Sequence, residues 1–223
     1  MFQKLILVTL SLVSALLLFV PESAAQQPNT ITGQQQSDSG RMKRNEFGVW
    51  GGISFHAPTL IGKTPDARFG NIGLRYGRVL AANENLAFSW TIDAVPVAVL
   101  STNRFTIVPT GPGTFTIQRS REHTYGAGVS PIGLKLNFRR AQMLQPFVSG
   151  SGGFLYFTKD VPVSGAAQFN FTYDFGGGIQ IVNDSGRAIT VGYKYNHISN
   201  GYHSPINPGV DVQMIYVGYS IRR

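Results

Sequence analysis

The chain has 223 residues, no cysteine and a formal net charge of +8. Without cysteine, neither a disulfide-stabilised small secreted domain nor a lipoprotein attached through a lipidated cysteine is available. The basic residues occur singly or in pairs rather than in a clustered stripe, which argues against a nucleic-acid partner and favours a polyanionic membrane surface.

The N-terminus has the organisation of an export signal. Lys4 provides a positive n-region, residues 5–20 are mostly apolar, and small residues precede a cleavage site after Ala25. The apolar stretch is shorter than the roughly 20 residues that a membrane-spanning helix needs. We therefore expect a signal peptide over residues 1–25. The next segment, residues 26–45, is rich in Gln, Ser, Asn and Gly and is expected to be flexible.

From residue 46 onward, apolar residues alternate with small or polar residues at a period of two. In residues 168–175 every second side chain is aromatic, and Gln, Asn, Thr and Asp stand between them. This period is typical of β-strands that have one apolar and one polar face. Eight such stretches are present, at about residues 46–56, 67–80, 85–100, 124–138, 144–158, 166–182, 187–198 and 211–222.

These stretches predict an all-β fold, an eight-stranded antiparallel transmembrane β-barrel over residues 46–223. Eight is a permitted strand number for an outer-membrane barrel, and the charged, glycine-rich faces suit a narrow polar lumen. A soluble β-sandwich would also alternate, but it would turn its apolar face inward. The sequence therefore favours a protein of the bacterial outer membrane.

The connections alternate between short turns and longer loops, which places both chain ends in the periplasm. The longer loops, which would then face the cell exterior, lie near residues 57–66, 101–123, 159–165 and 199–210. Trp50 and Trp90 are expected to join the tyrosines in girdles at the membrane interfaces. Arginines in the second loop either contact lipopolysaccharide phosphates or only increase solubility: Arg104, Arg119 and Arg121.

A chemistry-bearing motif lies at the end of the seventh stretch, where His197 and Ser199 are two residues apart and Asp211 opens the eighth stretch. A serine hydroxyl needs a base to remove its proton, and a carboxylate best orients that base. Residues i and i+2 of a strand share a face, so His197 lies beside Ser199. We expect these residues to form a Ser-His-Asp triad on the lipid-facing rows, near the outer leaflet.

An esterase also needs hydrogen-bond donors for the oxyanion of its tetrahedral intermediate. The loop after Ser199 supplies three candidates, which are Asn200, the backbone N–H of Gly201, and Asn207. Nothing in the sequence decides which donor points to the reacting carbonyl. His203, in the same loop, is an alternative base, and a solvated loop histidine is its simpler interpretation.

These residues resemble the lipid A 3-O-deacylase (PagL) family, whose members carry a His-x-Ser-Asn run, an Asn-Pro-Gly-like turn and an acidic residue entering the last strand. The resemblance is dense from Gly192 to Ile221 and extends to the rest of the domain in architecture only. It implies a serine esterase that hydrolyses the ester-linked acyl chain at the 3 position of lipid A in lipopolysaccharide. The family usually has Glu where this chain has Asp211.

Two other functions remain open from the residues alone. One is a non-catalytic structural or adhesive outer-membrane barrel, which needs no triad. The other is a different lipid acyl hydrolase or an acyltransferase, which would use the same nucleophile on another donor or acceptor. No cluster of His, Cys or carboxylates has metal-ligand spacing and no glycine-rich phosphate loop is present, so we expect neither metal nor cofactor. The sequence leaves the oligomeric state open.

Overall fold

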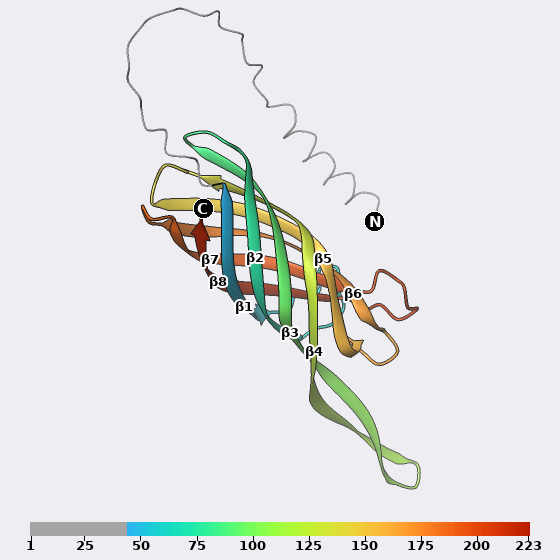
Figure 1. Ribbon diagram of the computed structural model, residues 1–223. Helices are drawn as coiled ribbons and strands as arrows, with labels where there is room; N and C mark the ends of the chain where they lie inside the picture. Colours follow the sequence, from blue (N-terminus) through green and yellow to red (C-terminus); the bar gives the residue numbers. More distant parts are fainter. Residues whose placement is uncertain (1–43) are drawn as a thin grey trace, which may run out of the picture. The chain divides into compact units, whose positions relative to one another are not determined.

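The computed structural model describes residues 44–223, which form a closed antiparallel barrel (Figure 1). The predicted signal peptide and all but the last two residues of the segment 26–45 lie outside the described residues. Each strand pairs with the next one along the chain, and β1 also pairs with β8. The strands are β1 (Asn45–His56), β2 (Arg68–Ala82), β3 (Leu86–Gly111), β4 (Thr114–Phe138), β5 (Leu144–Val161), β6 (Ala167–Val182), β7 (Arg187–Ser199) and β8 (Val210–Arg222).

The predicted eight-stranded barrel is confirmed, and most strand ends agree with the alternation to within a few residues. In the described part of the chain, no helix is long and apolar enough to cross a membrane.

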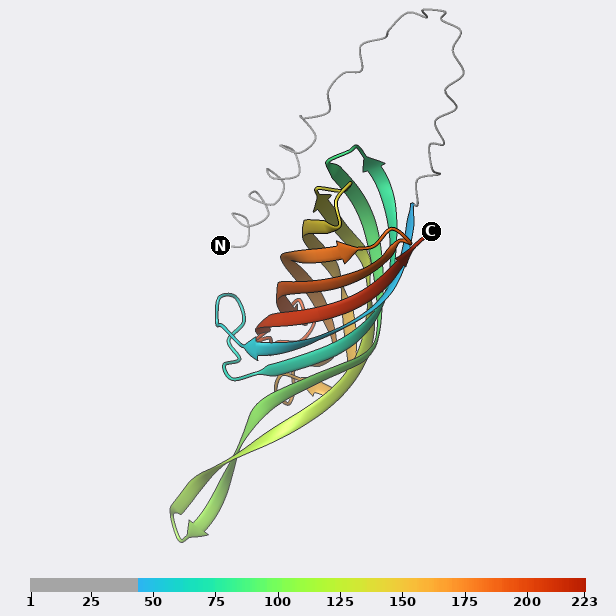
Figure 2. The same ribbon diagram turned by 90° about the vertical axis from the view of Figure 1, so that its left-hand side faces the viewer.

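The connection between β3 and β4 differs from the prediction of a loop over residues 101–123. The two strands continue pairing from Ser101↔His123 to Gly111↔Thr114 and form a two-stranded ribbon that projects beyond the barrel (Figure 2). Thr, Ile and Phe favour extended backbone, and antiparallel pairing of the two strands satisfies their backbone hydrogen bonds outside the membrane as well. Arginines and polar residues interrupt the apolar rows here, which is why the alternation predicts earlier ends for the two strands. We call the barrel end that carries it the ribbon end.

The outer surface of the barrel wall is apolar, as the alternation predicts. On β7, Ile189, Val191 and Tyr193 are 40–56% exposed, and on β8, Ile215 and Val217 are 52% and 61% exposed. A continuous apolar surface of this kind is unfavourable in water and suits a lipid environment. The alternate residues of both strands point into the barrel.

At the end of the barrel opposite the ribbon, the lumen is closed by a polar network around Glu46. This carboxylate accepts hydrogen bonds from Gln180 and Ser220, both at 3.1 Å. It also forms ion pairs with Lys135 at 3.5 Å and with Arg222 at 3.2 Å. The charges are therefore paired, as buried charges must be when water is excluded.

Trp50 lies in the middle of the lumen, so the prediction that it joins an interfacial girdle is wrong. Its side chain is 6% exposed, its indole N–H donates to Asp93 at 3.1 Å, and the Lys194 ammonium lies 3.9 Å from its ring centroid. Phe47, Val49 and Ile53 form the apolar outward row of β1, so Trp50 stands on the other row, whose remaining residues are small or polar. The expectation of a girdle follows from the residue type and overlooks this parity. Trp90 packs edge-on against Tyr76 instead.

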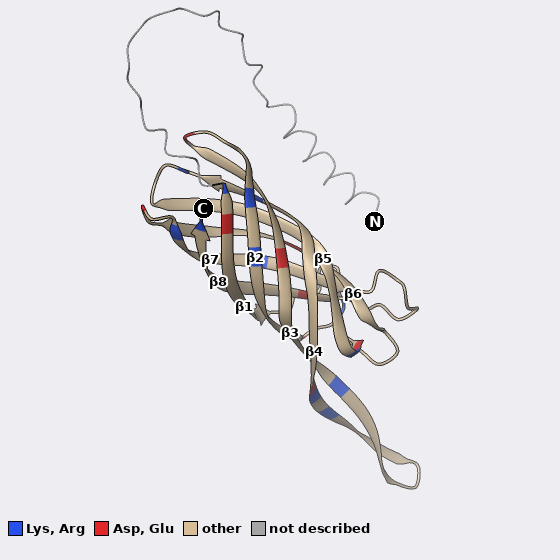
Figure 3. Ribbon diagram, in the orientation of Figure 1, with Lys and Arg blue, Asp and Glu red and all other residues tan. Residues whose placement is uncertain are grey.

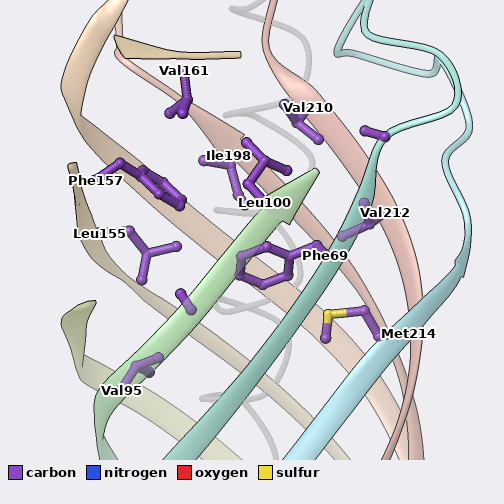
Figure 4. Close-up of a cluster of buried hydrophobic side chains, with 12 residues drawn as sticks. Phe69, Val95, Leu100, Leu155, Phe157, Val161, Ile198, Val210, Val212 and Met214 are labelled. Atoms are coloured by element: carbon purple, nitrogen blue, oxygen red, sulfur yellow. The ribbon is translucent and has the colours of Figure 1, made fainter. Parts of the chain in front are cut away.

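The lumen at the ribbon end is apolar, which corrects the expectation of a polar lumen throughout. Twelve buried hydrophobic residues from five strands and the β1–β2 connection pack together there, and Figure 4 shows their side chains converging. Leu100, Phe157, Ile198, Val210 and Met214 are each at most 1% exposed. Residues 94–100 are apolar on both faces except for Pro96, so alternation could not reveal this filling. The apolar cluster is the inner support for the ends of β7 and β8.

Candidate active site

The register of the last two strands brings His197 and Asp211 face to face. His197 lies near the end of β7 and is the direct partner of Asp211 at the start of β8. The imidazole Nδ1 and the carboxylate Oδ1 are 2.6 Å apart. Both residues belong to the outward-facing rows, yet His197 is only 7% exposed and Asp211 is fully buried. Because the pair is directly opposed, the shorter Asp reaches the imidazole without the extra methylene of Glu.

The connection between β1 and β2, residues 57–67, covers Asp211 from outside. Its backbone N–H groups at Ile61 and Gly62 donate to the carboxylate Oδ2 at 2.7 and 2.9 Å. Asp211 thus accepts neutral donors on one oxygen and the imidazole on the other. Backbone amides are neutral, so they satisfy the hydrogen-bonding capacity of the Asp211 carboxylate without cancelling its charge, and they fix its orientation.

Further hydrogen bonds fasten this connection to the turn before β8. The Lys63 backbone N–H donates to the Pro208 carbonyl at 2.6 Å, and the Thr64 hydroxyl donates to the Gly209 carbonyl at 2.6 Å. A Cβ on Gly62 would lie 2.9–3.0 Å from backbone atoms of residues 209–211. Glycine is therefore required at position 62 for this close approach.

The second imidazole nitrogen of His197, Nε2, takes no part in the contact with Asp211. Its ring packs against the Tyr173 ring, with centroids 5.1 Å apart. An ionised carboxylate only accepts hydrogen bonds, so the hydrogen of this contact lies on Nδ1, and in a neutral imidazole Nε2 is then the nitrogen with the lone pair. This orientation is the one that the base of a Ser-His-Asp triad needs.

Ser199 is the last residue of β7 and is partly exposed. It shares the outward face with His197 and pairs in register with Phe171 of β6. Within residues 44–223 its hydroxyl has no hydrogen-bond partner. A partly exposed hydroxyl without a hydrogen-bond partner, two residues from an oriented imidazole, has the properties expected of a nucleophile.

The three oxyanion candidates differ in what their groups already bind. Asn200 is 1% exposed, and its side chain donates to the Ile206 carbonyl at 2.9 Å and accepts from the Tyr202 N–H at 2.9 Å. The Asn200 N–H donates to Asn207 Oδ1 at 3.1 Å, which identifies the other Asn207 side-chain atom as the Nδ2 donor. In the described structure, Asn207 Nδ2 and the Gly201 N–H have no partner.

His203 stacks on Phe171 with ring centroids 5.6 Å apart, and its side chain has no carboxylate partner in the described range. It therefore lacks the orienting group that His197 has. No group of three or more metal-ligating side chains occurs among residues 44–223.

Comparison with known proteins identifies the family. The family model described as lipid A 3-O-deacylase (PagL) matches residues 71–220. The chain belongs to the lipid A 3-O-deacylase (PagL) family. The predicted family is thus confirmed, and with it a lipid A deacylase of the outer membrane.

Among solved structures, "Crystal structure of the outer membrane enzyme PagL" has a TM-score of 0.52 at 14% identity and covers 78% of this chain and 98% of that chain. Neisserial surface protein A has a TM-score of 0.45 at 12% identity, covering 81% and 97%. No curated protein matches the chain. Residues 57–67, which hold Asp211 in this structure, precede the range that the PagL family model matches.

Proposed function

We propose that Ser199, His197 and Asp211 are the catalytic triad with which this PagL-family protein removes the 3-O-linked acyl chain of lipid A. The observation that carries the proposal is the 2.6 Å contact between His197 Nδ1 and Asp211 Oδ1 on the lipid-facing side of the barrel. A buried His–Asp pair with a purely structural role would need neither a serine beside the histidine nor a second imidazole nitrogen without a partner.

The reaction would proceed in two balanced steps. Ser199 Oγ attacks the acyl carbonyl while His197 Nε2 takes its proton, and the sugar oxygen then leaves with that proton, which gives an acyl-enzyme and a free 3-hydroxyl. Water then attacks the acyl-enzyme, with His197 again acting as the base. The proton returns to Ser199 Oγ as a free fatty acid departs. Asp211 holds the imidazole and stabilises its charged form in both steps.

Ser199 and His197 are joined by no hydrogen bond in this structure. Both side chains project from the same strand face, and we propose that a rotation of Ser199 about its Cα–Cβ bond turns the hydroxyl toward the imidazole when substrate binds. Nucleophile–base contacts are often loose without substrate and tighten when it binds.

For the oxyanion we propose Asn207 Nδ2 and the Gly201 N–H as donors. Removal of one such donor typically slows catalysis by about 10²- to 10³-fold. Asn200 has another role, because its side chain fastens the loop and its N–H orients the Asn207 amide. In this proposal Asn200 is a positioning residue.

The site is reached from the membrane. Its outward-facing row continues the apolar surface of β7 and β8, so a lipid diffusing in the bilayer brings its ester to Ser199 without leaving the membrane. We propose that the ribbon end faces the cell exterior, which puts the triad at the outer-leaflet side. We further propose that residues 1–25 are removed on export and that residues 26–45 precede the barrel of residues 46–223.

The test is hydrolysis of purified lipopolysaccharide by the folded protein in detergent, followed by mass spectrometry of the lipid A. We expect loss of one ester-linked acyl chain from the 3 position and release of the matching free fatty acid. Transfer of that chain to another lipid would instead indicate an acyltransferase. Unchanged lipid A, with the barrel shown to be folded by its heat-modifiable gel migration, would contradict the proposal.

A further inference from the structure

A cleft lies between the end of β1, the β1–β2 connection and the base of the ribbon. Its volume is about 720 Å³. The wall is formed by residues 54–59 on one side, by residues 65–68 on the other, and by Arg119 and Arg121 of β4. Figure 3 shows basic residues on the ribbon where it leaves the barrel.

The cleft has an excess of positive charge. Three arginines line it against one carboxylate, that of Asp66. Arg119 Nη2 lies 3.2 Å from Asp66 Oδ2, but the two side chains are 55% and 63% exposed, so their ion pair is weak. Arg121 donates to the Asp66 carbonyl at 3.0 Å. Arg68 has no side-chain partner within residues 44–223.

Other basic residues near the cleft share one carboxylate. Arg104 of the ribbon pairs with Glu122, and Lys159 of β5 also pairs with Glu122 at 2.8 Å. Of the arginines that the sequence suggested for lipopolysaccharide contact, Arg119 and Arg121 line the cleft, whereas Arg104 is held by Glu122. The cleft therefore holds two of these three arginines together with Arg68.

We infer that this cleft binds a phosphate group of the lipid A substrate, an inference that rests on the proposed function. Guanidinium groups match phosphate oxygens with paired hydrogen bonds, which is why arginine predominates in such sites. The cleft also borders the lipid-facing wall, because Phe55 on its rim is 61% exposed on the outward row of β1. A phosphorylated lipid headgroup combines an apolar anchor with the required anion.

The cleft and the triad share the β1–β2 connection. The two ends of this connection line the cleft, while Ile61 and Gly62 in its middle hold Asp211. The arginines of the cleft belong to β2 and β4, each of which is three strands from β7 around the barrel, and strands are about 4.8 Å apart, so these arginines lie roughly 14 Å from the Ser199 row measured along the wall. A disaccharide headgroup spans such a separation, with its phosphate in the cleft and its ester at Ser199.

The experiment compares two substrates, bis-phosphorylated lipid A and the same lipid A after chemical dephosphorylation, both in detergent micelles. Arg68→Gln and Arg121→Gln remove charge from the cleft. Arg78→Gln is the matched control, since it removes an exposed arginine from the other end of β2. For each cleft variant we expect KM for the phosphorylated lipid to rise about tenfold, the effect of losing one charge-assisted hydrogen bond, with kcat little changed. On the dephosphorylated lipid the cleft variants should equal the parent, and Arg78→Gln should equal it on both.

A fourth variant separates phosphate binding from support of the loop. Asp66→Asn breaks the ion pair with Arg119 but leaves all three arginines in place. If the arginines bind phosphate, this variant keeps or lowers the parent KM for phosphorylated lipid A. If they only hold the loop, Asp66→Asn and the arginine variants lose activity on both lipids alike, and the inference is overturned.

An unchanged KM in both arginine variants would also overturn the inference, and would leave the triad proposal intact. Failure of the parent protein to deacylate either lipid would overturn the proposed function itself. The two failures are therefore distinguishable within one set of assays.

Discussion

Two buried aspartates on opposite sides of the barrel wall show how environment sets the role of a carboxylate. Inside the lumen, Asp93 accepts hydrogen bonds from Arg75 at 2.8 and 2.7 Å and from Trp50 at 3.1 Å. On the outside, Asp211 accepts two backbone amides and the His197 imidazole. Asp93 is bound to a permanent cation, whereas Asp211 is bound to a group that gains and loses a proton. The first environment suits a carboxylate that stabilises the fold, and the second suits the catalytic role that we propose for Asp211.

The largest expected effect is on the groups that react. Ser199→Ala and His197→Ala should each lower the deacylation rate by about 10⁴- to 10⁶-fold, because members of a nucleophile–base unit fail together. The rate is measured on lipopolysaccharide in detergent by release of fatty acid. Heat-modifiable gel migration serves as the control for folding, and near-parental turnover in either variant would remove that residue from the triad.

Asp211→Asn should have the next largest effect, a loss of about 10²- to 10⁴-fold, because the amide favours the wrong imidazole tautomer while the oxyanion donors remain. Asp211→Glu restores the usual family residue and should retain far more activity, with a rate about tenfold below the parent because the longer arm shifts the imidazole. The rates are compared on one lipid at one pH. His203→Ala is the control and should equal the parent; if it abolished turnover while Asp211→Asn did not, the base would be His203.

Gly62→Ala tests whether the β1–β2 connection must approach Asp211 closely. The added Cβ would meet backbone at 2.9–3.0 Å, so the connection must retreat and loosen its two hydrogen bonds to the carboxylate. We expect a loss of about tenfold in kcat, comparable to a small displacement of a catalytic group. Gly152→Ala is the matched control, because a Cβ there meets nothing within 4 Å. Equal kcat values for the two variants would show that the connection does not position Asp211.

Asp93→Asn should change the rate least, by no more than about twofold, while costing about 3 kcal/mol of stability because it leaves Arg75 buried without its counter-charge. Urea unfolding in phospholipid vesicles measures the stability, and the lipid assay measures the rate. A large loss of rate at unchanged stability would make the two aspartates alike and would break the comparison.

The sequence predicted the barrel, its strand number and the outward row of the triad because each follows from a period of two. It also placed His197 opposite Asp211, since neighbouring antiparallel strands need only the correct register, and it placed Ser199 on the same strand face as His197. Other features depend on contacts between distant segments. The hydrogen bonds from Ile61 and Gly62 cross 150 and 149 positions to Asp211, and no local pattern in the connection identifies that partner.

The inner face of the wall was less predictable than the outer face. Tryptophan is typical of membrane interfaces, but Trp50 lies on the small and polar row of β1, which faces the lumen, so the residue type predicts the wrong position. The sequence predicts a loop where β3 and β4 form the ribbon, because arginines and threonines interrupt the apolar rows there. Alternation of apolar and polar residues shows which face of a strand contacts lipid. It no longer distinguishes the two faces where a strand leaves the membrane or where the barrel interior is also apolar.

The hydrogen bonds between the β1–β2 connection and Asp211 cross the seam where the first and last strands meet. Before β1 pairs with β8, the amides of Ile61 and Gly62 are not held beside the carboxylate, and the imidazole lacks its fixed acceptor. With the triad that we propose, closure of the barrel is also the step that completes the active site. A chain whose first and last strands have not yet paired then carries every reacting residue without holding them in their working arrangement.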